Sequence, residues 1–204
     1  MKKYRIIGLT GQSGAGKSTV AEFIKGDGIC VINADLLVAR LYNSGSVCIK
    51  SLSSAFGAEI INCDGSLNRP VLAQKAFSSK KNTELLNSIV HPFVIYEFLR
   101  EIKAAAFGGA ELVVFDAPQL FECNADMICD VIISVTADLQ TRIERICRRD
   151  KISREQALQR VNAQYDEDFF RKNADYIINN NHELNKTQEQ IKEILSELGP
   201  NRGD

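Results

Sequence analysis

The residues with the clearest chemistry stand near the start of the chain, in the segment GQSGAGKS at residues 11–18. The pattern Gly-x4-Gly-Lys-Ser follows an apolar run and precedes a helical pattern, which is the setting of a phosphate-binding loop. Glycines let backbone N–H groups converge on phosphate oxygens, Lys17 can bridge the β- and γ-phosphates, and Ser18 can offer its hydroxyl to Mg²⁺. The alternative is a glycine-rich turn before an ordinary helix. We predict that this phosphate loop (residues 11–18) and the next residue bind ATP through Gly11, Gln12, Ser13, Gly14, Ala15, Gly16, Lys17, Ser18 and Thr19.

Two carboxylates follow predicted strands at the sheet edge where parallel α/β folds hold their ligands. Asp35 comes directly after the run that ends at Asn33 and begins a helical pattern. A carboxylate there could accept a proton from an attacking hydroxyl, or it could cap the helix, since Asp is favoured at N-caps. Asp116 ends another apolar run and could hold a Mg²⁺-bound water, the alternative being a structural role at a strand end. Ser18 and Asp116 are therefore the predicted metal ligands.

A third group is cationic and lies in the segment QTRIERICRRD at residues 140–150. Arg145 and Arg149 are four residues apart, and Arg142 and Arg145 are three apart, so each pair shares one face of a helix. Guanidinium groups suit a reaction in which charge develops on a transferring phosphoryl group. The alternative is a solvated face that is paired with Glu144.

These residues need an α/β scaffold, and the pattern of the chain predicts one. Short runs rich in Ile and Val indicate strands at residues 4–9, 30–33, 112–115, 131–135 and 176–178. Amphipathic patterns indicate helices at residues 17–25, 35–42, 69–77, 83–106, 139–149, 153–165 and after 185. Continuous apolar strands separated by helices predict a five-stranded parallel sheet that is covered on both faces.

The spacing of the strands is uneven. About 80 mostly helical residues separate the second and third strands, far more than a simple crossover requires. We therefore predict one domain over residues 1–204 with a helical insert at approximately residues 57–110.

Composition excludes several classes of protein. The net charge is −1 and charged residues make up 25% of the chain, so no general basic field predicts binding to nucleic acid or to an anionic membrane. No run approaches the roughly 20 apolar residues that cross a bilayer. The six cysteines lack metal-binding spacing and are typical of free thiols in a reducing compartment. We expect a cytoplasmic protein without nucleic-acid or membrane partners.

Beyond these motifs, the chain resembles the dephospho-CoA kinase family. The similarity extends almost from end to end, and the order and intervals of its segments are more specific than any one segment after the phosphate loop. The segments are IGLTGQSGAGKST, INADLLVAR, FGAEIINCDGSLNRPVLAQKAF, LLNSIVHP, DAPQLFE, RICRRDKISREQALQRVNAQ and ADYIINN.

The resemblance implies a reaction and its substrates. Members transfer a phosphoryl group from ATP to the 3′-hydroxyl of dephospho-CoA, which gives coenzyme A and ADP in the last step of CoA biosynthesis. Asp35 matches the second Asp of the family's Asp-Ala-Asp segment, the proposed catalytic base. Asn33 stands in place of the first Asp, and Gln119 replaces a leucine of the family's Pro-Leu-Leu-Phe-Glu segment.

The resemblance also assigns residues outside the phosphate loop. Arg145 and Arg149 match the arginines of the family's lid, here approximately residues 138–152, so that Lys17, Asp35 and these two arginines form the predicted catalytic set. The helical insert would bind the acceptor, with Arg69 and His91 as its predicted substrate-binding residues, and Arg142 of the lid is the third. The alternatives are a solvated surface charge for Arg69 and a packed or capping residue for His91. Arg142 stands where the family more often has glutamine. Gln164 and Asn179 match positions near the nucleotide base.

Two other functions remain open at this point. Another P-loop kinase could phosphorylate a nucleoside or a small metabolite, although the large insert and the Asn-Ala-Asp segment argue against it. A nucleotide-dependent switch could bind ATP without transferring phosphate. The candidate base and the arginine-rich helix disfavour the switch.

Overall fold

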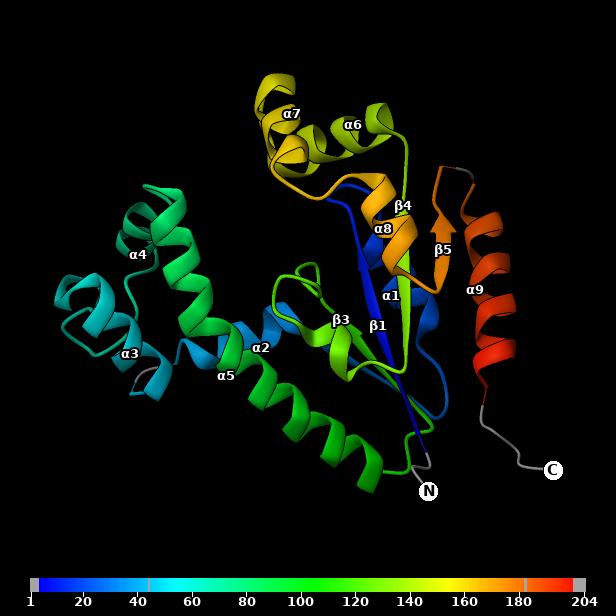
Figure 1. Cartoon of the computed structure of the whole chain (residues 1–204), viewed down its shortest axis with the longest axis horizontal. Helices are drawn as coiled ribbons and strands as arrows, with labels where there is room; N and C mark the ends of the chain where they lie inside the picture. The colour runs from blue at the N-terminus through cyan, green and yellow to red at the C-terminus, as the bar shows by residue number, and fades with distance from the viewer. Residues whose placement is uncertain (1–3, 44, 182, 200–204) are drawn as a thin grey trace. The chain divides into compact units, whose positions relative to one another are not determined.

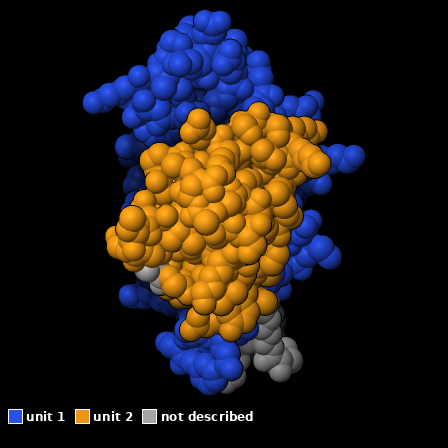
Figure 2. Space-filling model, turned by 90° about the vertical axis from the view of Figure 1, so that its left-hand side faces the viewer, with its two compact units in different colours: residues 1–32, 103–204 blue, residues 33–102 orange. Residues whose placement is uncertain are grey.

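The computed structural model describes residues 4–43, 45–181 and 183–199 (Figure 1). The chain divides into two compact units, which Figure 2 shows in different colours. Unit 1 contains residues 1–32 and 103–204, and unit 2 contains residues 33–102. Within the described residues no helix combines the length and the apolar character that crossing a bilayer requires.

Unit 1 is built on a five-stranded sheet with the order β2-β3-β1-β4-β5. Strand β1 pairs in parallel with β3 and β4, and β4 pairs in parallel with β5. Strand β1 is buried almost throughout, which matches its continuous apolar sequence. The predicted parallel sheet is confirmed, and each predicted strand lies within one or two residues of an observed one. The strands are β1 (Arg5–Gly11), β2 (Ile29–Asn33), β3 (Leu112–Asp116), β4 (Val131–Thr136) and β5 (Tyr176–Asn179).

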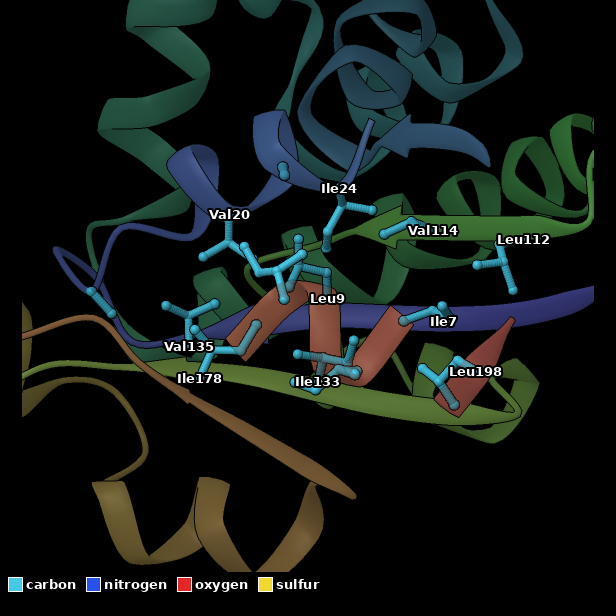
Figure 3. Close-up of a cluster of buried hydrophobic side chains, with 14 of the residues drawn as sticks. Ile7, Leu9, Val20, Ile24, Leu112, Val114, Ile133, Val135, Ile178 and Leu198 are labelled. Carbon is cyan, nitrogen blue, oxygen red and sulfur yellow. The ribbon is translucent and has the colours of Figure 1, made fainter. Parts of the chain in front are cut away.

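The main core of unit 1 lies between one face of the sheet and the helices α1 (Lys17–Ile24) and α9 (Leu184–Leu198) (Figure 3). Alternation along β1 places Ile7 and Leu9 on this face and Gly8 on the other. A Cβ on Gly8 would lie 2.7 Å from Leu120, so glycine is needed where that side chain packs on the strand. The core holds β1 and the N-terminus of α1 in place, and with them the phosphate loop that joins the two.

Helices α6 (Leu139–Asp150) and α7 (Arg154–Asn162) form a hairpin with a small core of its own. Ile143 and Ile146 pack there against apolar side chains of α7. A capping box begins α7, in which Ser153 and Gln156 satisfy each other's backbone amides. Unit 1 also contains the 3₁₀ turn η2 (Ala125–Ile128) and the short helix α8 (Glu167–Asn173), which the sequence pattern did not predict.

Unit 2 is helical. It contains α2 (Ala34–Leu41), α3 (Val47–Phe56), the 3₁₀ turn η1 (Ala58–Ile60), α4 (Arg69–Ala76) and the part of α5 (Lys80–Phe107) that ends at residue 102. The helices predicted at residues 35–42, 69–77 and 83–106 are confirmed, whereas α3 was not predicted. Pro92 lies inside α5.

Candidate functional site

The phosphate loop presents free backbone donors at the start of α1. Gly14 and Gly16 have φ angles of 80° and 98°, a left-handed conformation that favours glycine. Among the described residues, the amides of Gly14, Gly16, Lys17 and Ser18 donate no hydrogen bond. Converging free N–H groups at a helix N-terminus form a site for an anion.

Helix α6 holds the carbonyl oxygens of the loop through two arginine side chains. Arg142 donates from Nε to the oxygen of Ser13 at 3.0 Å. Arg145 donates from Nη1 to the oxygens of Ala15 at 3.1 Å and Gly14 at 3.4 Å. Two of the predicted arginines therefore support the backbone of the loop in this structure. Their predicted contacts with substrate stay a prediction.

Two glycines of the loop are required by protein neighbours. A Cβ on Gly14 would lie 2.6 Å from the carbonyl oxygen of Arg142, and a Cβ on Gly16 would lie 2.1 Å from Nδ2 of Asn180. In the phosphate-loop motif, glycines keep side chains away from phosphate. The structure adds that these glycines allow α6 and the segment after β5 to pack directly on the loop.

Replacing Gly14 with alanine is expected to weaken ATP binding and to destabilise the protein. The left-handed backbone alone costs about 1–2 kcal/mol for alanine, and the contact with Arg142 adds to this cost. Gly109→Ala is the matched control, because Gly109 has a φ of 83° but its Cβ would meet nothing within 4 Å. Denaturant titration and calorimetry measure both effects. Equal losses of stability, with ATP affinity unchanged in both variants, would contradict this account of Gly14.

Lys17 and Asp116 form a largely buried ion pair between Nζ and Oδ1. Their side chains are 13% and 4% exposed. Asp116 ends β3 opposite Leu9 of β1, so the parallel pairing brings it to the edge from which the loop begins. The structure thus joins the predicted phosphate-binding lysine to the predicted metal ligand, 99 residues further along the chain.

The arginines of α6 differ in their surroundings. Arg142 is 4% exposed, and burial lowers the pKa of its guanidinium, which the charge of Glu167 partly offsets. Arg149 is exposed and pairs with Asp150, as does Arg160 of α7. The hydrogen bond from Arg149 and the charges of both arginines lower the pKa of Asp150 to about 2. Arg149 is therefore tied to the α6–α7 hairpin, and its predicted contact with phosphate stays a prediction.

In unit 2, Asp35 lies in the first turn of α2 and is exposed to solvent. The cap of this helix is Asn33, whose Oδ1 accepts a hydrogen bond from the amide of Leu36 at 3.0 Å. The alternative that Asp35 is the N-cap is therefore wrong, because Asn33 already fills that position. The carboxylate of Asp35 is not occupied in capping and can serve chemistry.

The other predicted substrate-binding residues of unit 2 lie on separate helices. Arg69, the first residue of α4, places its guanidinium 5.7 Å from the ring centroid of Tyr42. Burial raises the pKa of Tyr42, and the charge of Arg69 partly opposes that rise. His91 is half-buried within α5, one residue before Pro92. Whether Arg69 and His91 bind substrate stays a prediction.

Unit 2 also contains a mostly apolar pocket of about 670 Å³, a size typical of ligand sites. At its rim Arg40 pairs with Glu101 at 2.7 Å. Sequence reasoning did not identify this pocket, since α3 was missing from the predicted helices. It is lined by Arg40, Leu41, Ser46, Val47, Cys48, Pro92, Phe93, Tyr96 and Glu97.

Residues from the C-terminal half complete the surroundings of the phosphate loop. Gln164 accepts a hydrogen bond from the amide of Ser13 at 2.9 Å. Asn180 donates from Nδ2 to the oxygen of Ala15 at 2.7 Å. The family resemblance indicated a site near Gln164 but none at Asn180, whose only signal in the sequence is the run of polar residues after the last strand.

Comparison with known proteins identifies the family. A family model for dephospho-CoA kinase matches residues 5–186. A dephospho-CoA kinase of Listeria monocytogenes is 38% identical over 199 residues, which cover 97% of this chain and 99% of that protein. The crystal structure of TT1252 from Thermus thermophilus has a TM-score of 0.82 at 33% identity and covers 97% of this chain and 99% of its own. A dephospho-CoA kinase from Campylobacter jejuni shares the fold, with a TM-score of 0.70 at 22% identity and coverage of 95% and 96%. A family model that matches nearly the whole chain and a relative of similar length show that the chain belongs to the dephospho-CoA kinase family.

Proposed function

We propose that the protein transfers the γ-phosphoryl group of ATP to the 3′-hydroxyl of dephospho-CoA. The observation that carries this proposal is the set of free amides in the phosphate loop beside Lys17, in a chain of this family. The amides and the start of α1 bind the phosphates of ATP. Lys17 exchanges its ion pair with Asp116 for the β- and γ-phosphates and stabilises charge during transfer.

Mg²⁺ is the proposed metal partner of ATP. Mg²⁺ is usually held by one or two carboxylates together with phosphate oxygens and water, and when bound it neutralises charge on the phosphates. Ser18, exposed at the start of α1, and Asp116, at the end of β3, provide a suitable hydroxyl and carboxylate. No cluster of three or more metal-binding side chains occurs among the described residues.

On the acceptor side, Asp35 takes the proton of the attacking hydroxyl. This role is supported by its exposed position in the first turn of α2 and by the capping of that helix by Asn33. The pocket of unit 2 and the cation of Arg69 are the features of that unit that suit a long acceptor with apolar and phosphate parts. We place the acceptor in unit 2 on this basis.

Arg145→Ala and Arg149→Ala are expected to lower turnover more than they weaken acceptor binding, because lid charges act most strongly on the transition state. Arg160→Ala is the control for Arg149→Ala, since both arginines pair with Asp150. Turnover and the acceptor KM measured for all three variants separate the roles. Equal effects of Arg149→Ala and Arg160→Ala on turnover would show that Arg149 acts only through its structural ion pair.

The experiment that tests the function is a coupled assay of ADP formation with dephospho-CoA as acceptor. A panel of nucleosides and small alcohols tests for another P-loop kinase. We expect dephospho-CoA to be phosphorylated with the highest kcat/KM. ATP binding without ADP formation for any acceptor would instead indicate the nucleotide-dependent switch.

A further inference from the structure

Asn180 is a buried residue whose polar groups all have partners. It is 3% exposed and directly follows β5. Its backbone amide donates to the oxygen of Thr136 at 2.9 Å, which anchors it to the end of β4. The side-chain Nδ2 donates to the backbone oxygen of Ala15. The backbone oxygen of Asn180 accepts a hydrogen bond from Nη2 of Arg145 at 3.0 Å. One asparagine therefore connects the sheet edge, helix α6 and the phosphate loop.

Thr187 on α9 donates a hydrogen bond to that side-chain amide. Its Oγ1 lies 2.9 Å from Oδ1 of Asn180, and Thr187 is fully buried. The carbonyl of Ala15 can only accept a hydrogen bond, so the nitrogen of the amide must face it and the oxygen must face Thr187. The hydroxyl of Thr187 must then donate. A flip of the amide would set Oδ1 against the oxygen of Ala15, so the contact with Ala15 fixes the orientation of the amide and the hydrogen bond from Thr187 holds its oxygen end in place.

The contact determines the direction of an amide that phosphate uses. The oxygen of Ala15 and the N–H of Gly16 belong to one planar trans peptide, in which they point in opposite directions. Holding that oxygen toward Asn180 turns the N–H of Gly16 away from it. This N–H is one of the donors that have no partner within the described residues.

We infer that Asn180 is a positioning residue of the phosphate loop: supported by the hydrogen bond from Thr187, it holds the Ala15 carbonyl and thereby aims the Gly16 amide at bound phosphate. The inference rests on the proposed phosphate-binding role of the loop and not on the identity of the acceptor. It can therefore be tested by binding measurements alone, and a negative result would not contradict the proposed kinase activity.

Two isosteric substitutions test the role. Asn180→Asp keeps the acceptor for Thr187 but replaces the donor to Ala15 with an oxygen that repels the carbonyl. Thr187→Val adds no charge and removes the hydrogen bond to Oδ1 of Asn180, which leaves that buried oxygen without its donor and loosens the side chain that holds Ala15. Asn181→Asp is the matched control for added charge, because Asn181 bonds to the amide of Asp138 at 2.7 Å and not to the loop.

The measurements are calorimetric affinities for ATP and for inorganic tripolyphosphate, each with Mg²⁺ present. We expect Asn180→Asp to weaken both ligands by about tenfold or more, the usual effect of losing a hydrogen bond to a charged group. Thr187→Val should weaken both by a smaller factor, and Asn181→Asp should have little effect on either. In the kinase assay, the KM for ATP should rise in the first two variants while the KM for dephospho-CoA stays constant.

The comparison between the two ligands makes the result decisive. Weaker ATP binding with unchanged tripolyphosphate binding would assign Asn180 to the nucleotide base and overturn the inference. A lower melting temperature with both affinities unchanged would show a purely structural role and also overturn it. If Asn180→Asp does not fold, Thr187→Val decides the question by the same two affinities.

Discussion

Replacing Lys17 with alanine is expected to lower phosphoryl transfer by about 10³-fold or more, the scale found for cations that stabilise a transferring phosphoryl group. In the proposed function, the lysine is the residue of the loop that brings a full positive charge to the β- and γ-phosphates. The coupled assay with dephospho-CoA measures the loss. Turnover close to that of the unchanged protein would remove the central claim of the proposed function.

The ion pair with Asp116 makes this variant more complex than the sequence alone suggests. Without Lys17, the largely buried carboxylate of Asp116 loses its cation, and breaking such a pair often costs about 3–5 kcal/mol of stability. Lys17→Ala combined with Asp116→Asn removes the charge of the carboxylate together with the lysine that faces it. This double variant should regain stability, so unfolding of the single and double variants measures the structural cost of losing Lys17. Its activity is expected to stay low, because Asp116 is itself a proposed metal ligand.

Replacing Asp35 with asparagine is expected to lower the rate of transfer about 10²- to 10⁴-fold, the usual contribution of a general base, with ATP affinity unchanged. Asparagine cannot accept the hydroxyl proton, yet it keeps the size of the side chain. Because Asn33 caps α2, the substitution removes only a favourable charge in the first turn, worth about 0.3–1 kcal/mol. The measurements are the rate of ADP formation and the ATP affinity by calorimetry.

Asn68→Ala provides the opposite case in the same unit. Asn68 caps α4 by accepting a hydrogen bond from the amide of Val71, so its loss should lower stability by about 1 kcal/mol without removing chemistry. Asp35→Asn should instead lower the rate of transfer and leave the stability nearly unchanged. If its rate falls less than about tenfold, below the range of general-base effects, Asp35 is not the base, and the loose transition state of phosphoryl transfer needs none at this position.

Local sequence patterns were sufficient to predict most of the elements. The strands are short apolar runs because both faces of a parallel sheet are buried, and this signal located all five. Helix α3 was missed because its sequence VCIKSLSSAF mixes serine and β-branched residues, which are weak helix formers. The short helix α8 was missed because seven residues give too few turns for a periodic pattern.

The candidate site was predicted in its residue types but not in its contacts. The phosphate loop is local in sequence, so its fixed spacing identified it. The partners of its carbonyls lie 130 residues away at Arg145 and 165 residues away at Asn180, and no local pattern records such pairings. The same holds for the glycines, whose requirement at residues 14 and 16 comes from backbone and side chains that only the folded chain brings near.

The clamped carbonyls of the phosphate loop have a thermodynamic consequence. Fixing the backbone of one residue costs about 1–2 kcal/mol of conformational entropy, and a loose loop would incur that cost when phosphate ordered it. Here the oxygens of Ser13, Gly14 and Ala15 are already held by Arg142, Arg145 and Asn180. The loss of entropy therefore accompanies folding. In the proposed function, the nucleotide therefore meets a loop that is already ordered, and the free energy of its phosphate contacts would go into affinity instead of into ordering the chain.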